Sequence, residues 1–98
     1  MRVVLERFAL QELLDAVNYY SILSTKTANK FVSDFEHAVS LIKEHPLAFP
    51  ERFNGFRKCF FKKFNYALIY KAEITQIVIV AVMHNGREPN YWHKRAEQ

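Results

Sequence analysis

Ile77-Val78-Ile79-Val80-Ala81-Val82-Met83 decides the fold, because all of its positions are apolar. A strand with one face in water alternates apolar and polar residues, whereas a strand buried on both faces is apolar throughout. The stretch therefore predicts an interior strand of a sheet, over residues 76–84. Asn85-Gly86 follows it, and this dipeptide tolerates the positive φ angles at which strands turn or end.

Two further strands are predicted upstream of the apolar stretch, over residues 57–64 and 66–73. Only one or two residues separate neighbouring runs, which favours antiparallel hairpins. Pro46, Pro50 and Asn54-Gly55 mark a loop and a turn before the first of these runs. Residues 3–7 offer one more strand at the N-terminus.

Two amphipathic helices are predicted between that strand and Pro46. In residues 9–23 the leucines recur at nearly helical spacing, and polar residues occupy the other face. The hydroxyl groups of Ser24, Thr25 and Thr27 can cap a second helix, which should end at His45 because Pro46 disfavours helical backbone before it. The short connection favours an antiparallel helical hairpin.

The order β-α-α-β-β-β predicts an α+β fold. The N-terminal strand and the helical hairpin should pack on a small, mostly antiparallel sheet. A chain of 98 residues and 11.6 kDa suits a single domain, over residues 1–98.

Charge and composition restrict the possible partners. The net charge is +4, but residues 1–51 hold five Lys/Arg against seven Asp/Glu, whereas residues 52–98 hold nine against three. A basic half indicates a surface for nucleic acid or an acidic protein, or a solvated face without a partner. A lone cysteine, Cys59, favours the reducing cytoplasm and a core role, and no apolar stretch is long enough to span a membrane. Histidine spacing and glycine content predict neither a metal nor another cofactor.

The end of the chain resembles a known family. Residues 81–95 (AVMHNGREPNYWHKR) are similar to the ending AV-x-H-x-x-R-x-P-x-Y-W-x-x-R of ParE-like toxins. Other similar pieces occur in the same order along the chain: Tyr19-Tyr20, His45-Pro46, Arg57 and residues 64–70 (FNYALIY). The chain is identified by this resemblance as a member of the RelE/ParE superfamily of type II toxin–antitoxin toxins, on its ParE-like branch.

The resemblance implies a growth-arresting cytoplasmic toxin that is neutralised by an antitoxin encoded by the adjacent gene. ParE-like members inhibit DNA gyrase, and this target is favoured here. RelE-like members cut mRNA on the ribosome, which is the alternative. A non-toxic interaction module is the third possibility.

An RNA-cleaving toxin of this kind would be a metal-independent endoribonuclease. Such chemistry needs a base, an acid and cations around the phosphate. The candidates for these roles are Lys58, Lys62, His84, Arg87 and Tyr91. Lys58, Lys62 and Lys63 are expected on the first sheet strand after the loop, and Lys58 and Lys62 should share one face because they are an even number of residues apart. RelE-like enzymes place an arginine directly after the strand tyrosine, but Ala67 stands at that position here. This difference favours the ParE-like function.

The expected target-binding surface combines the C-terminal segment with Arg57, which opens the predicted sheet. Its members are Arg57, Arg87, Tyr91, Trp92 and Arg95. Arginine and aromatic side chains are frequent at protein hot spots and on nucleic-acid-binding surfaces. Structural roles stay open: the two C-terminal arginines can pair with Glu88, Glu97 or a helix carboxylate, the aromatic rings can cover the core, and Arg57 can fix the loop before the sheet.

Overall fold

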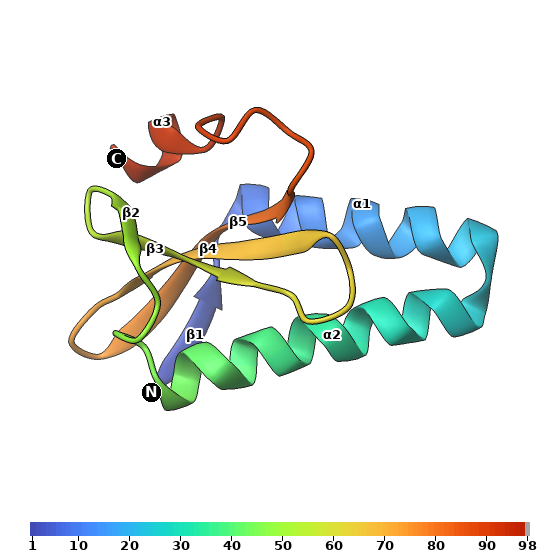
Figure 1. Cartoon of the computed structure of the whole chain (residues 1–98), viewed down its shortest axis with the longest axis horizontal. Coiled ribbons are helices and arrows are strands. Elements are labelled where there is room, and N and C mark those ends of the chain that lie inside the picture. Colours follow the sequence, from blue (N-terminus) through green and yellow to red (C-terminus); the bar gives the residue numbers. More distant parts are fainter. Residues whose placement is uncertain (98) are drawn as a thin grey trace.

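A five-stranded sheet organises the chain, of which the computed structural model describes residues 1–97 (Figure 1). The strands are β1 (Arg2–Leu5), β2 (Glu51–Phe53), β3 (Phe56–Phe60), β4 (Tyr66–Ala72) and β5 (Gln76–His84). Their order is β1-β5-β4-β3-β2, with β1 parallel to β5 and all other neighbours antiparallel. The apolar stretch forms β5, which lies between β1 and β4 as predicted, although β1 pairs only with its first half, Gln76 to Ile79.

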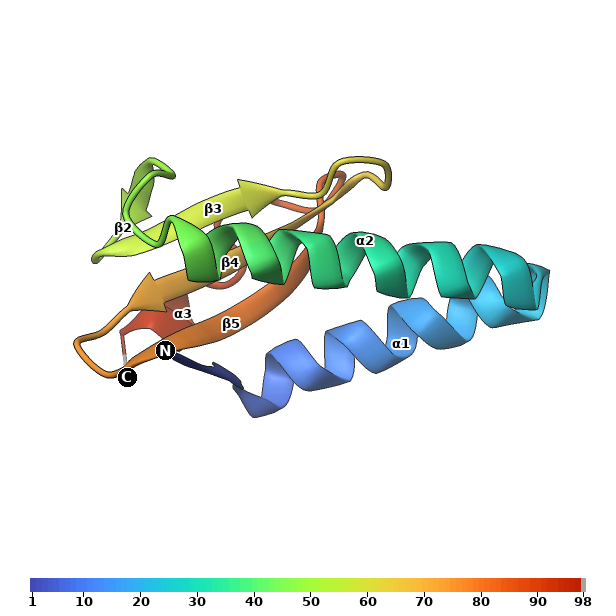
Figure 2. The same ribbon diagram turned by 90° about the horizontal axis from the view of Figure 1, so that it is seen from below.

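Two long helices cover one face of the sheet. α1 (Arg7–Leu23) and α2 (Thr25–Glu44) are joined by Ser24 alone, so they run antiparallel and side by side (Figure 2). Ser24 caps α2, because its Oγ accepts a hydrogen bond from the Thr27 backbone N–H at 2.9 Å. α2 stops before His45-Pro46, so the predicted hairpin and the predicted helix end are confirmed.

The core between helices and sheet is rich in aromatic rings. Phe31 of α2 is fully buried and stacks on Tyr20 of α1 at 5.1 Å between ring centres. The rings of Phe64 and Tyr66 meet the Phe31 ring edge-on, at 5.2 and 4.9 Å between ring centres. These contacts fix the hairpin against the sheet. Cys59 lies in this core, and burial raises the pKa of its thiol to about 11, so the thiol stays protonated.

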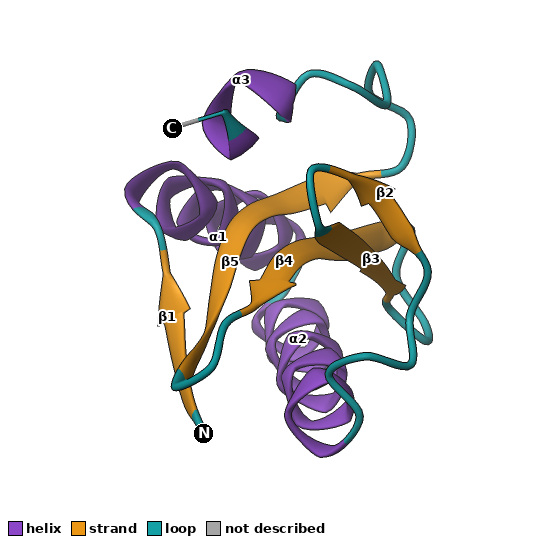
Figure 3. Cartoon of the chain, turned by 90° about the vertical axis from the view of Figure 1, so that its left-hand side faces the viewer, coloured by secondary structure: helices purple, strands orange, loops and turns teal. Residues whose placement is uncertain are grey.

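A second, smaller core occupies the opposite face of the sheet. The segment after β5 turns back over this face and ends in the short helix α3 (His93–Ala96), on the other side of the sheet from α2 (Figure 3). Its anchor is Trp92, whose ring contacts those of Phe53 and Phe56 at 6.1 and 6.0 Å between centres. The C-terminal segment is therefore a structural layer and not a free tail.

Three strand predictions were wrong. The N-terminal strand was predicted over residues 3–7, but β1 ends at Leu5 and Arg7 already begins α1. Residues 51–53 were predicted to be loop, but they form β2, which pairs with β3 through the Asn54-Gly55 turn with φ angles of 51° and 81°. β3 ends at Phe60, whereas the prediction continued it to Phe64. The reason is Asp34 of α2, whose Oδ2 accepts the backbone N–H groups of Lys63 and Phe64 at 2.9 and 2.8 Å. A buried carboxylate therefore replaces sheet pairing there.

Within residues 1–97, no helix combines the length and the apolar character that crossing a bilayer requires.

Candidate functional site

The site begins at an unpaired edge of β5. β1 ends at Leu5, opposite Ile79, so the second half of β5 has no strand on that side. Two side chains take the place of strand partners. Glu12 of α1 accepts the backbone N–H of Val82 at 3.1 Å, and Arg95 donates to the carbonyl oxygen of Val80 at 3.0 Å. Buried backbone groups need such partners, so both residues are part of the sheet's construction.

The carboxylate of Glu12 also holds the C-terminal segment. Arg87 donates to it at 3.2 Å, the Tyr91 hydroxyl at 2.6 Å, and Arg95 at 2.9 and 3.3 Å. The guanidinium of Arg87 stacks over the Tyr91 ring at 3.6 Å from its centre, and that of Arg95 lies at 5.0 Å from the same ring. We call Glu12, Arg87, Tyr91 and Arg95 the Glu12 cluster.

Exposure divides the Glu12 cluster into a structural and an accessible part. The side chains of Glu12 and Arg95 are 14% and 18% exposed, whereas that of Arg87 is 51% exposed. Burial and the hydrogen bond to Glu12 raise the pKa of the Tyr91 phenol far above its usual range. Tyr91 therefore remains protonated and is a poor general base, while Arg87 presents a cation that an approaching partner can reach.

Two other predicted target-binding residues have structural contacts. Trp92 is 2% exposed and fills the second core, so its ring is not part of the surface. Arg57 donates from Nη1 to the backbone carbonyl oxygens of Phe49 at 2.7 Å and Leu47 at 3.3 Å. It fixes the loop before β2, which is the structural role that the sequence left open.

The predicted catalytic residues do not form one group. Lys58 lies on β3, with its ammonium group 4.8 Å from the centre of the Phe60 ring, and burial and Arg52 lower its pKa. Lys62 is in the loop after β3 and not on the strand, so the expected shared face with Lys58 was wrong. It lines a hollow beside α2 instead.

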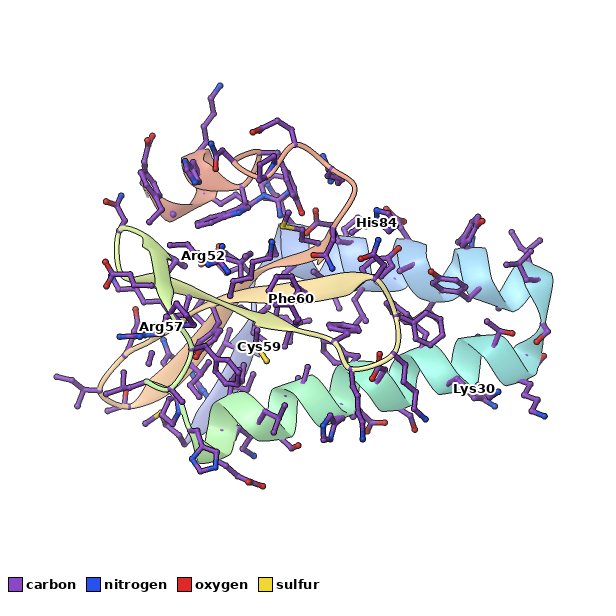
Figure 4. The ribbon with its side chains drawn as sticks, in the orientation of Figure 1. Lys30, Arg52, Arg57, Cys59, Phe60 and His84 are labelled. Atoms are coloured by element: carbon purple, nitrogen blue, oxygen red, sulfur yellow. The ribbon has the colours of Figure 1, made fainter. Side chains whose placement is uncertain are left out.

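His84 lies at the far end of β5 (Figure 4), where its Nδ1 accepts the backbone N–H of Gly86 at 2.9 Å. With Arg87 and Glu12 it lines a hollow of about 220 Å³, which Lys58 and Lys62 do not reach. Ala67 pairs with Phe60 and Met83 and is fully buried. No guanidinium stands at this position of the sheet.

Glu12 is the residue that sequence reasoning missed. It was assigned to the solvated face of the first helix, together with its polar neighbours. Its partners lie 70 to 83 residues further along the chain, beyond the range of any local pattern. The only available signal was the pair of C-terminal arginines, which required a carboxylate without saying which one.

Comparison with known proteins identifies first a similar fold and then the family of this chain. The fold resembles a solved structure described as the chromosomal ParDE TA system from P. aeruginosa, with a TM-score of 0.73 and 18% sequence identity. The similarity covers 86% of this chain and 95% of that chain. The two chains therefore share a fold. A comparison with curated proteins finds no match.

Residues 3–89 match the family described as the ParE toxin of the type II toxin–antitoxin system, parDE, and the chain belongs to this family. The predicted resemblance and the predicted α+β fold are confirmed. The matched range includes Glu12 and Arg87 and ends before Tyr91 and Arg95.

Proposed function

We propose that this toxin acts in the cytoplasm and arrests growth by inhibiting DNA gyrase, with Arg87 at the centre of the target-binding surface. The observation that carries the proposal is Ala67. It is buried on the sheet at the position where the resemblance to RelE-like enzymes would require an arginine beside the scissile phosphate. Without that cation, the developing charge on a cleaved phosphate has no partner there.

The arrangement of the other candidates supports binding over catalysis. Lys58, Lys62 and His84 lie in three separate surroundings, and general acid–base catalysis needs its groups within hydrogen-bond reach of one substrate. Tyr91 is held by Glu12 at 2.6 Å and stays protonated. An inhibitor that binds its target needs only an accessible, ordered surface, and the Glu12 cluster provides one.

The test is a direct comparison of the two activities. Purified protein is expected to block supercoiling of a relaxed plasmid by gyrase, and to leave mRNA intact in a purified translation system. Discrete cuts at ribosomal A-site codons, with supercoiling unaffected, would reverse the assignment. The absence of both effects, together with normal growth on expression, would identify a non-toxic interaction module.

One observation favours the alternative, a metal-independent mRNA endonuclease. Burial and the nearby Arg52 lower the pKa of Lys58, which makes its ammonium group a better proton donor than an ordinary lysine. The neighbouring Phe60 is exposed on the same strand, and an exposed ring can stack on a base. If the chain is an mRNA endonuclease, Lys58→Gln would abolish cleavage. If it is a gyrase inhibitor, the same substitution would leave inhibition unchanged.

The antitoxin is proposed to lie along the helical hairpin and the sheet. Leu10 and Leu14, one turn apart on α1, are 45% and 53% exposed, and Phe35 and Val39 of α2 line a hollow of about 270 Å³. Leucine side chains at this spacing suit the apolar side of a segment that orders on binding. Acidic residues of the same segment would meet the basic second half of the chain.

Copurification with the product of the adjacent gene tests this placement. The tagged toxin is expected to retain its partner in about 0.5 M salt, because apolar burial is not screened by ions. Leu14→Glu should release the partner. Ile22→Glu, at an even more exposed position of the same helix, should retain it. Copurification that is equally strong in both variants would contradict antitoxin binding at Leu10 and Leu14.

A further inference from the structure

A second positively charged surface lies away from the Glu12 cluster. The first half of α2 and the loop between β3 and β4 enclose a hollow of about 680 Å³. Four lysines line it, two from each element: Lys26 and Lys30, and Lys62 and Lys63. We call this hollow the lysine groove. Figure 4 shows Lys30 on α2, on the opposite side of the molecule from the C-terminal segment.

Asp34 explains why the two lysine pairs face each other. Its Oδ2 holds the backbone N–H groups of Lys63 and Phe64 at 2.9 and 2.8 Å, which fastens the loop to α2. Asp34 is the one acidic residue among those lining the groove, and it is only 5% exposed. The same carboxylate that ends β3 therefore positions the loop lysines, without offering an accessible anion to pair with them.

The four lysines have no ion-pair partners among the residues that the structure describes. Within the described part, residues 1–97, none of them has an acidic side-chain partner within 4.0 Å, whereas Arg87 and Arg95 both do. Lys26 and Lys30 are four residues apart on one helix, a spacing at which like charges repel. The groove is thus a concentrated positive field, which an anionic ligand with several charges would relieve.

The remaining lining indicates the class of ligand. Thr25, Asn29 and Ser33 follow one row of α2 at intervals of four residues and offer uncharged hydrogen-bonding groups between the lysines. The imidazole of His37 is the one aromatic ring among the lining residues, so the groove offers a single small surface for base stacking and no row of rings. No large apolar side chain lines the groove, so it lacks the anchor that a protein partner would need. Phosphate contacts, in contrast, require only cations and polar donors.

We propose that the lysine groove binds the phosphodiester backbone of a nucleic acid, independently of base sequence. This function is separate from gyrase inhibition and from antitoxin binding, because it uses neither the Glu12 cluster nor the exposed Leu10 and Leu14 of α1. Four phosphate contacts would make the affinity strongly dependent on salt, with a slope of about −3 for log K against log salt concentration.

The test measures binding by fluorescence anisotropy with the full chain. The probes are labelled 20-residue single-stranded RNA, single-stranded DNA and duplex DNA of mixed sequence, titrated between 50 and 200 mM salt. The variant Lys30→Gln/Lys62→Gln removes one lysine from each side of the groove. Its matched control, Lys43→Gln/Lys94→Gln, removes the same charge from exposed positions outside the groove.

The groove variant is expected to bind about tenfold more weakly, with the salt slope reduced by about two, while the control changes by less than about twofold. The probe that binds most tightly then identifies which type of nucleic acid supplies the phosphates. An equal loss in both variants would overturn the proposal, as would the absence of binding at 50 mM salt or binding of a polyglutamate peptide alone. Both variants must keep the thermal midpoint of the parent chain, which circular dichroism checks.

Discussion

Glu12→Gln is expected to lower the thermal midpoint by more than about 10 °C. The carboxylate accepts hydrogen bonds from Val82, Arg87, Tyr91 and Arg95. An amide at this position turns an NH₂ group towards some of these donors and leaves the charge of Arg95 unpaired. Removing one partner of a largely buried ion pair costs about 3 kcal/mol or more, and 1 kcal/mol corresponds to roughly 4–8 °C in a domain of this size.

Glu36→Gln is the matched control for this variant. Glu36 lies exposed on α2 and, within residues 1–97, makes neither an ion pair nor a side-chain hydrogen bond, so its midpoint should change by less than about 2 °C. The fluorescence of Trp92, the only tryptophan, reports the fate of the C-terminal segment. A midpoint for Glu12→Gln within the range of the control would mean that the cluster contributes little to stability.

Arg87→Ala is expected to weaken gyrase inhibition by about 30-fold while the fold persists. A hot-spot arginine contributes about 2 kcal/mol or more to an interface, which corresponds to this factor. The side chain is half exposed, and its bond to Glu12 is 3.2 Å long, so its loss should cost less than about 1 kcal/mol of stability. The measurements are the inhibitor concentration that halves supercoiling and the thermal midpoint.

Arg2→Ala serves as the control, since Arg2 is also exposed and makes one exposed side-chain hydrogen bond, to Gln76. It should inhibit gyrase as the parent chain does. Full inhibition by Arg87→Ala would place the target surface elsewhere. Arg95→Ala does not test the same question. Arg95 donates to Glu12 and to the Val80 carbonyl oxygen, so its removal should destabilise the fold.

The fold was predictable where local patterns decide it. The apolar run of β5, the hydroxyl groups before α2 and the proline after it are all strong local signals. The end of β3 was not predictable in this way. Residues 61–64 remain strand-like in composition, and only the contact with Asp34, some 30 residues earlier, removes them from the sheet. β2 was missed because three residues between Pro50 and a turn carry too little pattern.

The site was predictable in composition but not in arrangement. The sequence left open that the C-terminal arginines pair with a helix carboxylate and that an aromatic ring covers the core. Both contacts are present, because Arg87 and Arg95 pair with Glu12 and Trp92 packs in the second core. The exposure of Arg87 and the burial of Trp92 both depend on the path of the chain over the sheet. That path follows from the turn after His84 and from the register of β5. Neither is encoded in the spacing of residues 87–95.

The pairing of β1 with β5 has a consequence for synthesis of the chain on the ribosome. Arg2 lies opposite Gln76 and Leu5 opposite Ile79, so the first strand has no partner until the last one has emerged. The helical hairpin consists of local contacts and can form early, whereas closing the sheet requires contacts over more than 70 residues. A nascent chain released before residue 76 would lack β5, the unpaired edge that Glu12 occupies and the whole C-terminal layer. Premature termination should therefore yield no partly active toxin, and an antitoxin that recognises the sheet would have nothing to bind until translation is nearly complete.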